Sequence, residues 1–208
     1  MFAHTLIGHF DWFARYEVYA MTMMLTALAL IYATYWRDTG RSFLFKGFGA
    51  LIFLALLAGD FFISVFRSRA AAQNIYLQQY QMYRFATEVF PQTVAVNDLG
   101  YVSYRNDQHV LDLWGLGSEE ARLASTAAGG RFPAFLRAMT TAQDAKFAMI
   151  YEPWFEAGVP EEWCRIAVLH SLKVSVGFAD VQFFLIDSNP NAKMNAALDK
   201  FSQTLSQA

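Results

Sequence analysis

Two apolar runs near the N-terminus, residues 18–36 and 47–66, constrain this sequence more than any other feature. Each run is 19 or 20 residues long, and a helix needs about 20 residues to cross the roughly 30 Å of hydrocarbon in a bilayer. The first run carries no charged residue, and the second carries only Asp60. We therefore predict a membrane α-helical hairpin followed by a domain of mixed polarity.

The composition and charge of the chain agree with this division. Hydrophobic residues make up 55% of the 208 residues and charged residues 16%, against about 45–50% and about 25% in soluble domains. The net charge of −2 and the lack of a basic stripe argue against nucleic acid as a partner. Because Cys164 is the single cysteine, an internal disulfide and a cysteine-rich metal site are excluded.

Basic residues near the two runs predict which way the hairpin faces. The link between the runs, residues 37–46, holds three basic residues, whereas the flank before the first run holds one. The positive-inside rule compares such short flanks and places the link in the cytoplasm. We therefore expect residues 1–68 to be a two-helix anchor whose C-terminal side leads to the extracytoplasmic face.

Residues 69–90 show a helical pattern in which apolar residues recur at steps of three and four. One interpretation is a connecting helix that packs on the following domain. The other is an interfacial helix, because Tyr76, Tyr80 and Tyr83 form an aromatic set suited to the headgroup layer of a membrane. The pattern is compatible with both interpretations.

Residues 91–208 are expected to form an extracytoplasmic domain of the α/β or α+β class, a small mixed sheet with packed helices. Ser118 is predicted to cap a helix that has two glutamates in its first turn, and a further helix is expected after Pro190. Helix is also predicted at 133–142, and 160–171 is interpreted as the start of a helix or as a turn. The segments predicted as strands are 93–97, 101–104, 110–114, 147–151 and one or two strands within 174–187.

Three charged residues in the N-terminal part are candidates for contacts with a ligand. Asp60 is costly inside an apolar run and such a residue is normally paired or functional, although water or a headgroup can reach it six residues from the end of the run. Arg15 and Glu17 precede the first run. They are either solvated residues of an interfacial anchor, or Arg15 binds the phosphate of a lipid-linked substrate.

Two aspartates of the C-terminal domain, Asp98 and Asp112, follow or lie within predicted strands. A catalytic pair of carboxylates must converge in space, and Asp98 has an alternative role as a turn residue that binds its own backbone. The sequence shows no nucleophile motif and no set of metal ligands with recognisable spacing. We therefore assign no catalytic residue, no metal and no cofactor.

Several strings together resemble one family. They are WFARYEVY at 12–19, NIYLQQYQM at 74–82, VAVNDLG at 94–100, VLDLWGL at 110–116 and PEEW at 160–163. In this order they resemble the C-terminal part of bacterial multi-pass glycosyltransferases with the type-C membrane fold, which are related to protein mannosyltransferases. No single string is diagnostic, but the five occur in sequence across most of the chain.

The resemblance implies a role in hexosyl or pentosyl transfer from a polyprenyl-phosphate sugar in the bacterial inner membrane. The family's catalytic acid lies in an early extracytoplasmic loop of a many-helix bundle, and this chain has no counterpart of that loop. The expected function is thus a C-terminal membrane and periplasmic segment that is inactive alone, with Arg15, Glu17 and Asp60 near the lipid phosphate. The alternative is a non-enzymatic, membrane-anchored accessory protein that binds membrane lipid and a larger membrane protein.

Overall fold

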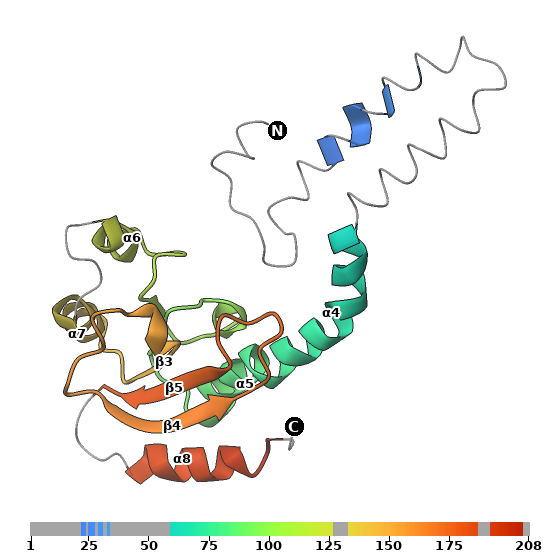
Figure 1. The fold of residues 1–208 in the computed structure, drawn as a ribbon. Helices are drawn as coiled ribbons and strands as arrows, with labels where there is room; N and C mark the ends of the chain where they lie inside the picture. Colours follow the sequence, from blue (N-terminus) through green and yellow to red (C-terminus); the bar gives the residue numbers. More distant parts are fainter. Residues whose placement is uncertain are drawn as a thin grey trace. The chain divides into compact units, whose positions relative to one another are not determined.

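The computed structural model describes residues 59–126, 133–186 and 192–205, together with isolated helical positions between 22 and 33 (Figure 1). By its internal contacts the chain divides into two compact units, residues 1–70 and residues 71–208. The second unit contains the sheet and the helices that cover it. It is an α+β fold with a five-stranded mixed sheet.

For the N-terminal part of the fold a membrane hairpin is predicted, and this prediction is wrong for the residues that the structure describes. Among the residues that the structure describes, no helix is both long enough and apolar enough to cross a membrane. The end of the second apolar run lies in helix α4 (Gly59–Leu77), which does not stop at the end of the run but continues through Arg67 and Arg69. It continues because residues 67–77 contain neither proline nor glycine and include three consecutive alanines. The rest of the two runs lies outside the described residues, apart from isolated positions between 22 and 33.

Helical structure over residues 69–89 was predicted, and it is confirmed in three pieces. Helix α4 is followed by α5 (Gln79–Arg84) and by one π-helical segment, η1 (Phe85–Val89). The backbone bends between α4 and α5 at Gln78, whose φ of −121° and ψ of −71° are not helical. The bend turns α5 and η1 onto the sheet, where Phe85 is fully buried.

The sheet has the strand order β2-β1-β3-β5-β4. Strand β1 pairs in parallel with β2 and β3, whereas β5 pairs antiparallel with both β3 and β4. The carboxyl ends of β1, β2 and β3 therefore meet at one edge of the sheet. The strand bounds are Val94–Val96 (β1), Val110–Asp112 (β2), Phe147–Ile150 (β3), Cys164–His170 (β4) and Asp180–Leu185 (β5).

Four of the predicted strand regions contain β1, β2, β3 and β5, and those predictions are confirmed. One strand prediction is wrong, and one prediction of a helix or turn is confirmed only at its start. Residues 101–104 were expected to be a strand, but the chain forms a 3₁₀ turn, η2 (Tyr101–Ser103), directly after Gly100, whose φ is +31°. Residues 160–171 are predicted to start a helix or turn containing Trp163, and a turn is present at 160–163, where the Trp163 N–H donates to the Pro160 carbonyl at 3.0 Å. The segment then continues as β4, which was not predicted and is held in place by its pairing with β5.

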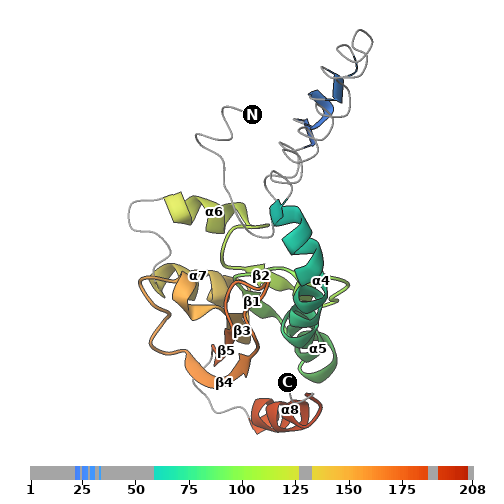
Figure 2. The same ribbon diagram turned by 45° about the vertical axis from the view of Figure 1, so that its right-hand side comes forward.

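Helices cover both faces of the sheet (Figure 2). On one face α5, η1 and α8 (Ala192–Ser202) pack against one set of alternating strand residues, and on the other face α6 (Glu119–Thr126) and α7 (Pro133–Ala142) pack near the opposite set. All three predicted helices are confirmed, and the Ser118 hydroxyl oxygen accepts the Ala121 N–H at 3.2 Å as the predicted cap. The alternation divides β1, β2, β3 and β5 between two cores.

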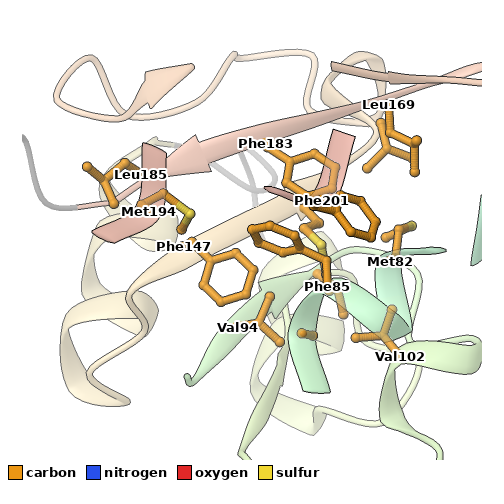
Figure 3. Close-up of a cluster of buried hydrophobic side chains, with 14 of the residues drawn as sticks. Met82, Phe85, Val94, Val102, Phe147, Leu169, Phe183, Leu185, Met194 and Phe201 are labelled. Carbon is orange, nitrogen blue, oxygen red and sulfur yellow. The ribbon is translucent and has the colours of Figure 1, made fainter. Parts of the chain in front are cut away.

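Phe85 occupies the middle of the first core (Figure 3). Its ring meets Phe147, Phe183 and Phe201 edge-on, with centroid separations of 5.6, 5.2 and 5.2 Å. These three partners come from β3, β5 and α8. Edge-to-face aromatic pairs add about 0.5–1.5 kcal/mol each beyond burial, so one side chain of η1 joins two strands and the last helix.

Candidate functional site at the carboxyl edge of the parallel strands

Polar side chains gather where the three parallel strands end. Asn97 and Asp98 directly follow β1, Asp112 is the last residue of β2, and Tyr151 directly follows β3. In sheets with parallel strands this edge is the usual place for a ligand or a reaction.

Asp112 is buried, with 4% of its surface exposed, and its carboxylate accepts four backbone N–H groups. Oδ1 accepts from Trp114 at 2.8 Å and from Gly115 at 3.0 Å. Oδ2 accepts from Gly117 at 2.6 Å and from Ser118 at 3.0 Å. Such charge-assisted bonds are roughly twice as strong as neutral ones, so Asp112 holds the loop between β2 and α6 in one conformation.

The same loop depends on the small size of Gly115. Its φ is +98°, and a Cβ at this position would stand 2.6 Å from the backbone nitrogen and Cα of Arg122. Contacts this short to backbone atoms leave no room for a side chain. The loop can therefore approach the backbone of α6 this closely only because residue 115 is glycine.

Asn97 extends the pairing of β1 and β3 by one step. Its amide donates to the Tyr151 carbonyl at 3.1 Å, and its carbonyl oxygen accepts the Tyr151 N–H at 3.0 Å. The side chain thus mimics a strand backbone where the two strands separate. Because Asn97 is buried and both of its polar atoms are used, it fixes the position of Tyr151.

The Tyr151 hydroxyl lies between two glutamines at the bend of the helix. It donates to Gln78 Oε1 at 2.6 Å and accepts from Gln79 Nε2 at 3.0 Å, and the same Gln79 nitrogen donates to Asp98 Oδ2 at 3.1 Å. Burial raises the pKa of the Tyr151 phenol, the negative charge of Asp98 raises that pKa further, and the hydrogen bond from Gln79 opposes the shift. The phenol is therefore a neutral hydrogen-bond donor and is unsuited to act as a base at neutral pH.

Asn74 and Gln78 bind the loop between β4 and β5. Asn74 Oδ1 accepts the backbone N–H groups of Val174 and Ser175 at 3.0 and 2.9 Å, and its amide donates to the Leu172 carbonyl at 2.5 Å. The Gln78 amide donates to the carbonyls of Phe178 and Ala179 and to the Ser171 hydroxyl. We call the set Asn74, Gln78, Gln79, Asn97, Asp98 and Tyr151 the polar junction.

One atom of the polar junction lacks a partner. Gln79 Oε1 is the buried side-chain oxygen without a hydrogen bond among the described residues. It faces Gly100, where an added Cβ would lie 2.5 Å from it. A residue without a side chain, Gly100, is therefore required beside this amide.

The structure places Asp98 and Asp112 at the same sheet edge but gives their carboxylates different partners, Gln79 for the first and the loop backbone for the second. Asp60 lies in α4, and Arg15 and Glu17 lie outside the described residues. Within the described ranges no group of three histidine, cysteine or acidic residues is arranged to hold a metal ion. The sequence interpretation missed Asn97, Tyr151 and the two glutamines as linked residues.

A family model described as a domain of unknown function, DUF8728, matches residues 73–185. The chain belongs to the DUF8728 family. The matched segment contains more than half of the chain and includes every residue of the polar junction and all five strands, while α8 lies beyond it. No curated protein and no solved structure matches the chain.

Proposed function

We propose that this DUF8728 chain is a non-catalytic domain of a lipid-linked-sugar glycosyltransferase-like protein. The proposal rests on the hydrogen bonds of Asp112. Its carboxylate accepts four backbone N–H groups, at the sheet edge where an enzyme would place a reactive group. An ionised carboxylate has about four lone-pair positions, and the four N–H donors occupy them, so none is left to accept a proton from a substrate. Asp98 and the Tyr151 hydroxyl both accept a hydrogen bond from the side-chain nitrogen of Gln79.

The resemblance supports this proposal because two of its strings supply five of the six residues of the polar junction, and a third supplies Asp112. The string at 74–82 supplies Asn74, Gln78 and Gln79, and the string at 94–100 supplies Asn97 and Asp98. The string at 110–116 supplies Asp112 and the start of its loop. The residues that these strings supply to the polar junction thus hold the end of α4 on the sheet. The string at 12–19 lies outside the described residues.

In this proposal the domain is a rigid element beside the sugar-transfer site of the larger protein. Hydrogen bonds from Asn74 and Gln78 fix the last turns of α4 to the loop between β4 and β5. Side chains that are locked by such bonds hold a geometry to within fractions of an ångström. The domain would therefore present one fixed face to a donor or acceptor.

A sugar-transfer assay tests the proposal. Purified full-length chain is incubated with a polyprenyl-phosphate hexose and a peptide acceptor, in parallel with Asp98→Asn and a protein-free blank. We expect no transfer above the blank from either protein. Transfer by the unaltered chain that Asp98→Asn abolishes would show a catalytic centre at this edge and overturn the proposal.

A second candidate function, an accessory protein that binds a larger membrane protein, is favoured by a surface of five tyrosines. Their rings form a continuous series with centroid separations between 5.2 and 6.0 Å, and Arg105 lies over the last ring at 5.3 Å. Tyrosine and arginine dominate the energetics of protein interfaces. The series, which we call the tyrosine surface, consists of Tyr76, Tyr80, Tyr83, Tyr101 and Tyr104.

Affinity purification from native membranes tests this second candidate. We expect one stoichiometric partner with the unaltered chain and its loss with the double change Tyr76→Ala and Tyr104→Ala, since these two rings are 54% and 53% exposed. Leu172→Ala, an exposed residue outside the tyrosine surface, is the matched control. A partner retained equally by all three proteins, or no partner at all, would count against the tyrosine surface as a binding site.

A further inference from the structure

A groove of about 310 Å³ lies between the edge strand β4 and helix α8. It shares no residue with the polar junction or the tyrosine surface. Strand β4 is the last strand in the sheet order and pairs only with β5. The groove is lined by Ile166, Ala167, Val168, Leu169 and Phe183 from the sheet, and by Asn195, Leu198, Asp199, Phe201, Ser202 and Leu205 from α8 and the residues after it.

The outer edge of β4 presents backbone N–H and C=O groups that have no strand partner among the described residues. The Ser171 N–H donates to the Ala179 carbonyl at 2.9 Å, which continues the β4–β5 register by one residue. Hydrogen-bonded pairs alternate along an antiparallel ladder, so Leu169 also pairs with β5 while Val168 and His170 direct their N–H and C=O groups outward. Val168 is 50% exposed, and no strand formed by the described residues covers this edge.

A register shift between Arg165 and Ala167 limits the length of the open edge. Such bulges protect edge strands from random pairing. The bulge leaves a short regular stretch of pairing over residues 167–170. An extended peptide that paired with this stretch would lie beside the groove and place alternate side chains into it.

The lining of the groove indicates the chemistry of its occupant. The floor is apolar, with Phe183, Leu198 and Phe201 among its residues, and Asp199 is the only charged residue among the described residues that line it. An occupant with apolar side chains at alternate positions and one basic side chain would complement this lining. A helix or a compact small molecule would leave the outward N–H and C=O groups of β4 unpaired.

We propose that the groove between β4 and α8 binds an extended peptide segment of another protein, which adds to β4 as a sixth strand and places a basic side chain opposite Asp199. Peptide addition to an exposed sheet edge obtains affinity from main-chain hydrogen bonds and specificity from pockets for alternate side chains. Both features are present at this edge.

A display library of random nine-residue peptides, selected on the immobilised full-length chain, tests the proposal. We expect selected peptides to alternate apolar residues and to carry lysine or arginine. In fluorescence anisotropy with a labelled selected peptide, Val168→Pro should weaken binding at least tenfold, because proline lacks the outward N–H. Proline is tolerated at an edge strand position whose N–H faces solvent. Val168→Thr keeps that N–H and is the matched control, with an expected change below twofold.

Charge reversal at the rim supplies a test that does not depend on proline. Asp199→Lys should weaken the binding of the same peptide at least tenfold. Hydrogen exchange should show that the peptide protects the Val168 and His170 amides of the unaltered chain. This measurement remains decisive if Val168→Pro fails to fold.

Three results would overturn the proposal. The first is the selection of no peptide. The second is selected peptides that bind Val168→Pro and Asp199→Lys as tightly as the unaltered chain and leave both amides unprotected. The third is a concentration-dependent dimer of the chain that Val168→Pro converts to a monomer. Such a dimer would show that a second copy of the chain occupies the edge of β4.

Discussion

The Tyr151 hydroxyl donates a 2.6 Å hydrogen bond to Gln78 Oε1 and thereby joins the end of β3 to the bend between α4 and α5. The two residues are 73 positions apart in the sequence. Gln78 has non-helical torsion angles and no exposed surface. A buried phenol–amide contact therefore holds the C-terminal end of α4 on the sheet.

Tyr151→Phe should lower the free energy of unfolding by about 1–3 kcal/mol, because it leaves Gln78 Oε1 without this donor and removes an acceptor of Gln79. Urea unfolding followed by circular dichroism measures the change. Tyr104→Phe is the control, since Tyr104 is 53% exposed and its change should stay within about 0.5 kcal/mol. Equal losses in the two variants would show that the Tyr151 hydroxyl contributes nothing specific.

Stability should fall at alkaline pH because of the same phenol. Burial and the charge of Asp98 raise the pKa of Tyr151 in the folded state above its ordinary value of 10.0. Between the two pKa values the folded state binds more protons than the unfolded state, so the free energy of unfolding decreases as pH rises above that ordinary value. The slope for one group approaches about 1.4 kcal/mol per pH unit.

Urea unfolding at several pH values from about 9 to about 11 checks this sign. The stability advantage of the unaltered chain over Tyr151→Phe should shrink as pH rises through this window, because the variant has no phenol at residue 151 to ionise. An advantage that stayed constant would show that the phenol ionises equally in the folded and unfolded states.

Gly115→Ala should destabilise the chain more than Gly158→Ala. Both glycines have positive φ, +98° and +80°, so both changes cost about 1–2 kcal/mol of backbone strain. A Cβ at residue 115 would also meet the Arg122 backbone at 2.6 Å, whereas nothing lies within 4 Å of a Cβ at residue 158. Thermal unfolding of the two variants gives the comparison, and a lower melting temperature for Gly158→Ala would contradict it.

Local patterns in the sequence predict the α+β part of the fold well where they are strong. The β-branched run around β1 and the Ser118 cap with its following glutamates specify a strand and a helix start from neighbouring residues alone. Strand β4 shows no clean alternation of buried and exposed residues, so only its pairing with β5 makes it a strand. The end of α4 was misplaced because an apolar run and a helix need not share a boundary.

The candidate site was only partly predictable. Asp98 and Asp112 could be singled out as aspartates next to strands, and both do lie at the sheet edge. Their partners could not be inferred, because Gln79 comes from a helix bend and the donors to Asp112 come from a loop that depends on Gly115. The bidentate contact of Asn97 with Tyr151 requires β1 and β3 to be neighbours, which spacing in the sequence does not show.

We infer that the carboxylates at this edge serve structure and not catalysis, and urea unfolding of Asp112→Asn checks this account. The amide NH₂ would face at least one of the four backbone N–H donors, so the account predicts a loss of about 2–4 kcal/mol, within the range for a broken buried network. Glu120→Gln, an exposed acidic residue in the same region, should change little. Catalytic groups are often held at a cost in stability, so an Asp112→Asn variant as stable as the unaltered chain, or more stable, would contradict the account.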